Sequence, residues 1–536
     1  MQVDDPEGYA QYILAHSQRS HEQHLWSGVN YRQLAQFFRP RNPLSRSNSH
    51  TELFSFAVTH ALSVDGGRSI EEFDGEHGHT ELSTWLGRQG SSLSLIFLRG
   101  YPSANWLKTV GAHCRVDPEF FRRHLDFNSP QEFYDLPALP STARNIIKLR
   151  VTTVFRRTSL LDDKTIDKLR AEEEDHVREH QKQLNRVGES IVRKFSIHDK
   201  SYFSIEQNIS ICVCRRADKG WQAIIWTDTG KDLSKSPHGP WLKDKQSVSQ
   251  SQSLYATCVP ILYHHTMAPE RLDSQAGLSS SSEKPSNSFH SSSLLSTQYG
   301  LSLDPKIAAV DALYSISEVF LFIAGTEHQF LNMMAILLKK QLNPTLEYME
   351  ATIKNLNHIK ASIDSHHEYL EEALRCLEHG GDDNWPKASL SAHKDIAERT
   401  RNALVGDFAH LLQRAVKLSE SCTTGCNAIT NSTMLQEARA GLQQGAQMKR
   451  LTILAFLYLP LNLTTSFFGM NFREFGQGTL SLAWILAVLV PVVLITVGLF
   501  CWTAIAKLFR GRKGKKDKGV EDAASRTPTL PKTATV

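Results

Sequence analysis

Two long stretches without charge near the C-terminus constrain this chain more than any other feature. No charged residue occurs between Arg450 and Arg473, or between Glu474 and Lys507. Each stretch exceeds the roughly 20 apolar residues that a helix needs to cross a bilayer, and soluble helices seldom stay uncharged over such a length. We therefore predict a membrane protein with two C-terminal transmembrane helices rather than a buried soluble hairpin. They are placed at 451–470 and 480–506, with an external loop at 471–479 between them.

The charges that flank these spans predict their orientation. The tail 507–536 begins with seven Lys and Arg residues against the single acid Asp517, and Lys449 and Arg450 stand just before the first span. Cytoplasmic loops carry such an excess of positive charge, so both flanks are expected in the cytoplasm. The first 450 residues then lie on that side too. We expect an integral membrane protein, in the plasma membrane, with both termini cytoplasmic and a basic cytosolic tail.

The preceding 450 residues are too many for one core, and their pattern changes along the chain. Residues 1–50 are polar and irregular, and we predict a flexible N-terminal lead-in there. Residues 51–270 mix strand-like and helical segments, which predicts a cytosolic α/β domain. Strands are predicted at 92–100, 145–155, 208–216 and 221–229, with a hairpin turn at 217–220. Helices are predicted at 116–127, with Asp117 as N-cap, and at 165–192.

The second half of the cytosolic part is predicted to be helical. A Ser-rich linker or insertion at 271–300 precedes a helical hairpin at 301–390 and a stalk helix at 391–450. The apolar run near Phe320 carries Glu318, Glu327 and His328, so a packed amphipathic helix is expected there. Three/four spacing predicts two coiled-coil-like seams. They comprise Leu346, Met349, Ile353, Leu356, Ile363, Leu370, Leu374 and Leu377, and then Leu404, Phe408, Leu411, Ala415, Leu418, Cys422, Cys426 and Ile429. No proline occurs between Pro386 and Pro460, so the stalk helix can continue into the first span.

Composition and motifs argue against several classes of function. A net charge of +4 on 536 residues is too small for a general nucleic-acid binder, and eight cysteines give no disulfide framework. The sequence has no phosphate-binding glycine loop and no hydrolase or metalloprotease motif, so we do not expect an enzyme. The cysteine pairs Cys212/Cys214 and Cys422/Cys426 favour packing over metal binding. His366 and His367 are interpreted as exposed polar residues.

The first span carries a polar stripe. Five residues at three/four spacing share one helix face: Thr452, Ala455, Leu459, Asn462 and Ser466. An amide or hydroxyl that faces lipid is costly, so this face is expected to meet protein or water. Contact between helices is one interpretation, and a pore wall is the other. A subunit with two spans cannot enclose a pore alone, so a pore requires an oligomer.

At the end of that span, Gly469-Met470-Asn471 closes the first of two C-terminal spans, after a long helix and before a short loop and a basic tail. Here the chain resembles the CorA family of divalent-cation channels, which carries a Gly-Met-Asn signature at this point. The resemblance extends over about residues 445–515 and includes the segments 448–452, 459–461 and 468–472. Phe468 departs from the family, where a tyrosine commonly precedes the signature, and so does Asn462, where small hydroxyl residues are usual.

The resemblance implies a homopentamer whose first spans line a central pore. The selectivity loop would comprise Gly469, Met470, Asn471 and Glu474, with Asn471 amides holding a hydrated divalent cation, most plausibly Mg²⁺. Mg²⁺ keeps its waters tightly, so such a ring can bind the ion without stripping it. Met448 and Leu451 would form an apolar gate near the cytosolic mouth. The expected partners are further copies of the chain, the lipid bilayer and the transported ion, with no nucleic acid and no resident cofactor.

Two other functions remain open at the level of sequence. A zinc transporter of the ZntB branch has the same architecture and signature. A membrane-anchored scaffold with a vestigial pore would also carry a large cytosolic part. Ion uptake separates the channel from the scaffold.

Overall fold

The structure is a computed structural model of the whole chain. It describes residues 5–39, 54–75, 77–88, 93–126, 139, 145–216, 220–242, 256–262, 290–342, 349–468, 481, 483–484, 486–498 and 502. The chain divides into an N-terminal unit, Met1–Asn427, and a C-terminal unit, Ala428–Val536. This boundary falls within the predicted stalk 391–450 rather than at either of its ends.

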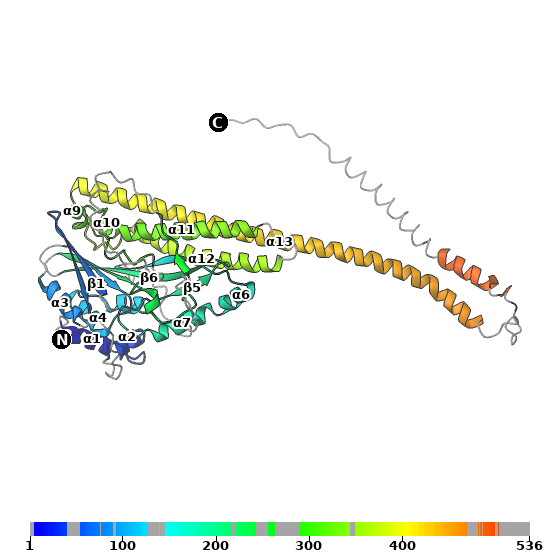
Figure 1. Ribbon diagram of the computed structural model, residues 1–536, viewed down its shortest axis with the longest axis horizontal. Coiled ribbons are helices and arrows are strands. Elements are labelled where there is room, and N and C mark those ends of the chain that lie inside the picture. The colour runs from blue at the N-terminus through cyan, green and yellow to red at the C-terminus, as the bar shows by residue number, and fades with distance from the viewer. Residues whose placement is uncertain are drawn as a thin grey trace, which may run out of the picture. The chain divides into compact units, whose positions relative to one another are not determined.

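A mixed eight-stranded sheet forms the centre of the N-terminal unit (Figure 1). The strands are β1 (Ser55–Leu62), β2 (Arg68–Asp74), β3 (Leu93–Arg99), β4 (Ile146–Arg157), β5 (Lys194–Ile197), β6 (Tyr202–Arg215), β7 (Trp221–Thr227) and β8 (Ala256–Cys258). Their order is β2-β1-β3-β7-β6-β4-β8, with β5 paired to β6. Among the strands that the structure describes, the β3–β7 pair alone is parallel. All four predicted strands are present, and β6 and β7 form the expected hairpin, although its turn at 217–219 lies outside the described residues.

Helices cover both faces of this sheet, which explains why β6 and β7 are almost continuously buried. On one face lie α1 (Pro6–Ser17), α2 (Arg32–Phe37), α3 (Gly78–Arg88), α4 (Ala104–His113) and α5 (Pro118–His124), with the 3₁₀ turn η1 (Val29–Tyr31). The α5 helix begins as predicted, because the Asp117 carboxylate accepts a hydrogen bond from the Glu119 backbone N–H at 2.9 Å. A second 3₁₀ turn, η2 (Leu233–Lys235), follows β7.

Residues 5–39, the described part of the flexible lead-in predicted for 1–50, are folded against the rest of the N-terminal unit. Tyr9 and Ile13 of α1 are buried in the core, and the Tyr9 hydroxyl donates a hydrogen bond to the Val116 carbonyl at 2.9 Å. Gly111 of α4 makes room for this ring, because a Cβ at Gly111 would lie 2.3 Å from it. Most of residues 1–50 are polar, so their composition does not indicate that a few apolar residues pack α1 against α4.

The charged helix predicted at 165–192 is also different, because it is split and shorter. The structure has α6 (Asp163–Ala171) and α7 (Glu173–Gln183), and the rest of the predicted helix, residues 184–192, is not helical. The Glu189 carboxylate accepts hydrogen bonds from the Asn185 and Arg186 backbone N–H groups, and Gly188 has a φ of +86°. These contacts stabilise a turn that competes with the helix.

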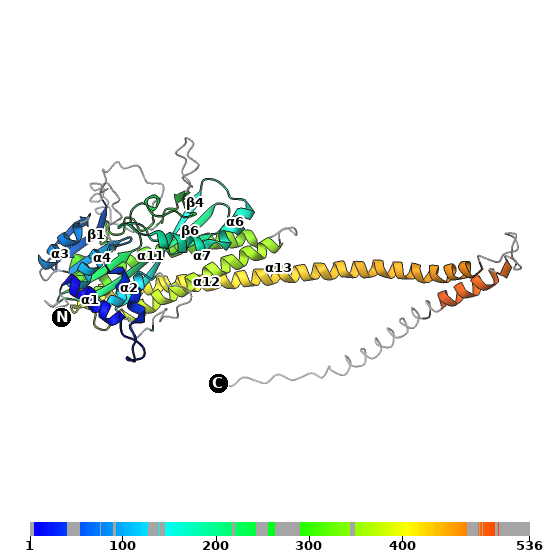
Figure 2. The same cartoon turned by 90° about the horizontal axis from the view of Figure 1, so that it is seen from below.

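The opposite face of the sheet carries the long helices (Figures 1 and 2). They are α11 (Ser317–Gln341), α12 (Met349–His379) and the first part of α13 (Ser391–Phe468), preceded by the short α9 (Pro305–Ala308) and α10 (Ala312–Ser315). The second predicted seam is largely buried, at Leu404, Phe408, Leu411, Ala415, Cys422 and Ile429. The rings of Phe320 and Phe408 lie 6.1 Å apart, which places α11 against α13. Residues 290–298 of the predicted Ser-rich linker are packed, with His290 and Ser292 buried.

One helix among the described residues, α11, is long and apolar enough to cross a membrane. More than half of its apolar window is buried, at 56%, and it packs on β4 and α12 inside the N-terminal unit. We therefore assign α11 to the protein interior, in agreement with the predicted amphipathic helix. In the C-terminal unit, α13 continues to Phe468, and a shorter apolar helix spans Leu486–Gly498 within the second predicted span.

Candidate functional site

The polar stripe predicted for the first span lies on a regular α-helix. Residues 448–468 of α13 are helical throughout. At 3.6 residues per turn, the five stripe positions fall within about 80° of one another around the axis. They are Thr452, Ala455, Leu459, Asn462 and Ser466, and all five are exposed. The structure therefore brings these residues onto one face, as predicted.

The remaining surface of this segment is apolar and also exposed. Three large side chains outside the stripe, Leu454, Phe456 and Tyr458, and Leu463 at its edge are each more than half exposed. A helix with such a surface is not stable in water by itself, so this segment requires lipid or other protein around it. The Thr452 hydroxyl donates to the Met448 carbonyl at 2.7 Å, so this hydroxyl needs no partner outside its own helix.

The two predicted gate residues stand about two to three turns before the centre of the stripe. By the same helical geometry, Met448 lies on the stripe face and Leu451 lies at its edge. Their side chains are 69% and 68% exposed. The predicted selectivity residues Gly469, Met470, Asn471 and Glu474 lie outside the described residues, so their arrangement stays a prediction.

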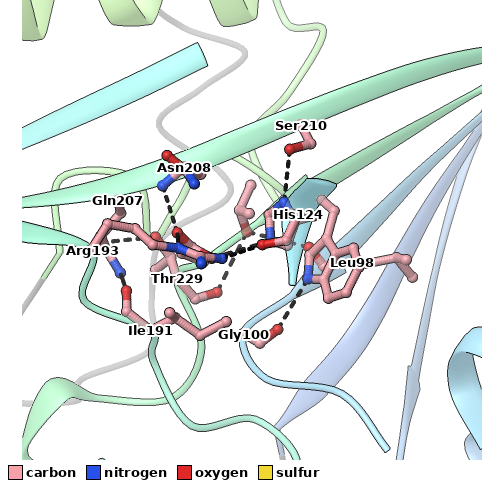
Figure 3. A network of polar contacts seen from close by, with 12 residues as sticks. Leu98, Gly100, His124, Ile191, Arg193, Gln207, Asn208, Ser210 and Thr229 are labelled. Atoms are coloured by element: carbon pink, nitrogen blue, oxygen red, sulfur yellow. Dashed lines mark hydrogen bonds and ion pairs between the residues drawn. The ribbon is translucent and has the colours of Figure 1, made fainter. Parts of the chain in front are cut away.

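A buried polar network lies within the sheet of the N-terminal unit (Figure 3). His124 Nδ1 lies 2.8 Å from the Ser210 hydroxyl, and His124 Nε2 lies 3.1 Å from the Asp228 carboxylate. Arg193 donates two hydrogen bonds to Asp228, at 2.7 and 2.8 Å. The His124 ring stacks on Trp226 with 3.9 Å between centroids.

The Ser210–His124–Asp228 contacts resemble the catalytic triad of a serine hydrolase, but these residues are not accessible to a substrate. Ser210, His124 and Asp228 are all buried, so no substrate reaches the hydroxyl. Burial lowers the pKa of His124 to about 4 despite the nearby Asp228 carboxylate. Burial alone would raise the pKa of Asp228, but Arg193 and His124 outweigh it and hold that pKa well below the usual range. We interpret the network as a structural link between α5, β6 and β7.

A second buried network joins the sheet to the long helices. His366 of α12 lies 2.7 Å from the Glu327 carboxylate of α11 and 3.5 Å from the Glu206 carboxylate of β6. Lys194 lies 3.3 Å from Glu206, and the Thr152 hydroxyl donates to Glu327 at 3.2 Å. Burial would lower the pKa of His366, but Glu327 and Glu206 raise it to about 9. His366 is therefore a buried cation.

This result corrects the interpretation of His366 as an exposed residue. The sequence does contain a signal for it, because Ile359, Ile363, His366 and Leu370 keep the three/four spacing of the buried face. The two glutamates that pair with it come from other elements. The sequence therefore indicates the burial of His366 but not its partners.

We expect the buried ion pair of His366 and Glu327 to make the stability of the protein depend on pH. The pKa of His366 is raised from 6.5 to about 9, so its contribution is fully present below pH 6.5 and is lost as the pH rises through 9. Glu327→Gln removes one of the two negative charges beside His366. The melting temperature of the full-length variant should then change less between pH 7 and pH 10 than that of the wild type. His379→Gln, at the exposed end of α12, should keep the wild-type dependence. If Glu327→Gln keeps the wild-type pH dependence, His366 is not a buried cation stabilised by Glu327.

Among the described residues, no group of three or more His, Cys, Asp or Glu side chains is placed to hold a metal ion. The thiols of Cys212 and Cys214 lie 3.6 Å apart in the core, where their mutual contact and then burial raise the pKa of Cys212. Cys422 is buried and its pKa is raised to about 11 by burial. Protonated buried thiols are poor metal ligands, so packing explains both pairs better.

Comparison with known proteins finds a similarity in the C-terminal part of the chain. Residues 387–503 match the family described as CorA-like Mg²⁺ transporter protein. Residues 387–503 are therefore similar to the CorA-like family, whose members are ion transporters rather than enzymes. The match starts before α13 and ends within the second predicted span. No curated protein matches the chain.

Solved structures of two proteins align with the chain at low identity. The complete structure of the CorA magnesium transporter from Methanocaldococcus jannaschii has 11% identity and a TM-score of 0.34, and the alignment covers 84% of this chain and 98% of that chain. The structure of the full-length CmaX protein has 10% identity and a TM-score of 0.29, with 86% and 99% covered. The similarity to the CorA-like family therefore rests on the match over residues 387–503 and not on these two structures.

Proposed function

We propose that this protein is a channel for divalent cations, with Mg²⁺ as the transported ion, in which the last turns of α13 line the pore. The observation that carries the proposal is the exposed stripe on α13 within residues 387–503, which are similar to the CorA-like family. The stripe combines an amide, two hydroxyl groups and small or apolar residues without any charge. Such a surface suits an ion that passes with its hydration shell.

The proposal includes two spans per subunit and an oligomeric pore. The second span would be 480–506, of which Leu486–Gly498 is helical and apolar. The selectivity loop would follow Phe468 and present Asn471 and Glu474 at the outer mouth. Hydrogen bonds from Asn471 amides of several subunits would hold the waters of the ion, and Glu474 would raise the local cation concentration although Arg473 opposes it. The transported ion is the substrate, and no resident cofactor is part of the proposal.

Uptake by cells that lack their own Mg²⁺ transporter tests this function. Expression of the full-length protein should restore growth at low external Mg²⁺ and should produce Mg²⁺ influx. A control truncated after Asn427 keeps the N-terminal unit and lacks the proposed pore, and it should not restore growth. Normal membrane insertion without any ion uptake would favour a scaffold, and uptake of Zn²⁺ in preference to Mg²⁺ would reassign the substrate.

We expect a homopentamer in mild detergent. One subunit offers a single polar stripe, and several stripes must surround a hydrated ion. Native mass spectrometry of the full-length protein should therefore show a pentamer as the main species. A purely monomeric or dimeric protein would contradict the pore.

A further inference from the structure

A loop between α1 and α2, residues 18–28, projects from the N-terminal unit and ends in two neighbouring apolar side chains (Figure 2). Leu25 is 89% exposed and Trp26 is 78% exposed. A single exposed apolar residue is common on a protein surface and needs no explanation. Two large ones side by side in the sequence, on a projecting loop, indicate a surface that meets another apolar phase.

The base of this loop is held by the backbone. The Gly28 N–H donates to the Arg19 carbonyl at 3.0 Å, and the His24 N–H donates to the Ser20 carbonyl at 3.1 Å. A Cβ at Gly28 would lie 1.8 Å from the His16 carbonyl oxygen, so the returning chain passes directly against the last turn of α1. The tip is therefore presented from a fixed base, which lowers the entropic cost of inserting it into a partner.

The chain that follows the loop is anchored on α5. The Tyr31 hydroxyl donates to the Glu119 carboxylate at 2.9 Å, and the Tyr31 ring lies 5.0 Å from the His16 ring, edge to face. Arg122 and Arg123 both pair with Glu119. This carboxylate therefore adds no uncompensated negative charge at the base of the loop.

The charges along this part of the chain are mainly positive. Among residues 8–39 the only acid is Glu22, against three arginines, Arg19, Arg32 and Arg39. All three arginines are exposed, and Arg19 and Arg32 stand on either side of the apolar tip in the sequence. An apolar tip between exposed arginines suits an anionic partner.

A lipid surface has the chemistry that matches this loop. Tryptophan favours the interface between water and bilayer, because its ring is apolar and its N–H is polar, and leucine adds apolar surface. Arginine pairs well with phosphate groups. A protein partner would need a pocket shaped for the tip, whereas a bilayer accepts a projecting tip without one. Membrane surfaces that face the cytoplasm carry the anionic lipids that arginines attract.

We propose that loop 18–28 binds an anionic lipid surface, with Leu25 and Trp26 inserted among the headgroups and Arg19 and Arg32 paired with lipid phosphates. The proposal requires neither a pore nor a transported ion, so it stands whether or not the protein conducts Mg²⁺.

Co-sedimentation with lipid vesicles tests the loop. The full-length protein is held in nanodiscs of phosphatidylcholine, which offer the loop no anionic surface, and is mixed with separate vesicles. Vesicles in which about a third of the lipid is phosphatidylserine should sediment the protein, and vesicles of phosphatidylcholine alone should bind it roughly tenfold more weakly or less. The basic tail 507–536 also attracts anionic vesicles, so the variants change the loop and leave the tail intact.

The apolar tip is tested without any change of charge. Leu25→Ser combined with Trp26→Ser should weaken binding to the phosphatidylserine vesicles roughly tenfold or more. Trp26→Phe keeps an apolar ring and should retain most of the binding. Leu160→Ser is the matched control, because Leu160 follows β4 and is 71% exposed outside this loop. It should bind as the wild type does.

The charged part is tested by Arg19→Gln combined with Arg32→Gln, which should weaken binding roughly tenfold. Arg178→Gln, at an exposed arginine on α7, is the control. Circular dichroism and the melting temperature check that each variant is folded. The proposal is overturned if phosphatidylserine vesicles bind no more protein than phosphatidylcholine vesicles do. It is equally overturned if either folded double variant of the loop binds as the wild type does.

Discussion

Asn471→Ala is expected to abolish Mg²⁺ uptake while the protein still inserts into the membrane. Asn471 lies at the outer end of the proposed pore, beyond the last described residue of α13. Mg²⁺ gives up its waters reluctantly, so a selective site has to hydrogen-bond those waters. Alanine removes this capacity from every subunit at once, and uptake should fall by roughly a hundredfold.

Uptake of radioactive or dye-reported Mg²⁺, normalised to the protein in the membrane, measures this effect. Asn402→Ala is a matched control, because Asn402 is an exposed asparagine on α13 in the N-terminal unit. It should leave uptake unchanged. Wild-type transport in Asn471→Ala would remove this residue from the selectivity site.

Replacing Met448 and Leu451 together with serine is expected to keep the pore conductive at high internal Mg²⁺. Both side chains are exposed on or beside the stripe face of α13, near the cytosolic end of the proposed span. Apolar rings close a pore by excluding water, and hydroxyl groups restore hydration. The double variant should therefore lose the inhibition of influx that internal Mg²⁺ produces in the wild type.

Current recordings over a series of internal Mg²⁺ concentrations measure this loss. Leu454→Ser is the control, because Leu454 lies about 120° round the helix from the stripe. This variant should keep the wild-type inhibition. If the double variant remains inhibited by Mg²⁺, the gate lies elsewhere.

Features fixed by local chemistry could be predicted from the sequence. Asp117 followed by Pro118 predicts the start of α5, because the cap and the first turn involve adjacent residues. The seam from Leu404 to Ile429 predicts the buried face of α13, because helical spacing alone decides which residues share a face. The stripe from Thr452 to Ser466 follows from the same periodicity.

Features that depend on distant contacts could not be predicted. Glu206, Glu327 and His366 come from β6, α11 and α12, and no local pattern brings them together. The order of strands in the sheet and the docking of α1 through Tyr9 are likewise set by tertiary packing. The break between α6 and α7 was missed because charged residues with high helix propensity continue through it.

Mg²⁺ flux into liposomes that contain only the purified full-length protein tests the central claim most directly. With Mg²⁺ outside and an indicator dye inside, the wild type should admit Mg²⁺ down its gradient, faster when the interior is negative, and Asn471→Ala should not. Liposomes with the truncated N-terminal unit supply the background. Absence of flux through an inserted, oligomeric wild-type protein would contradict the channel.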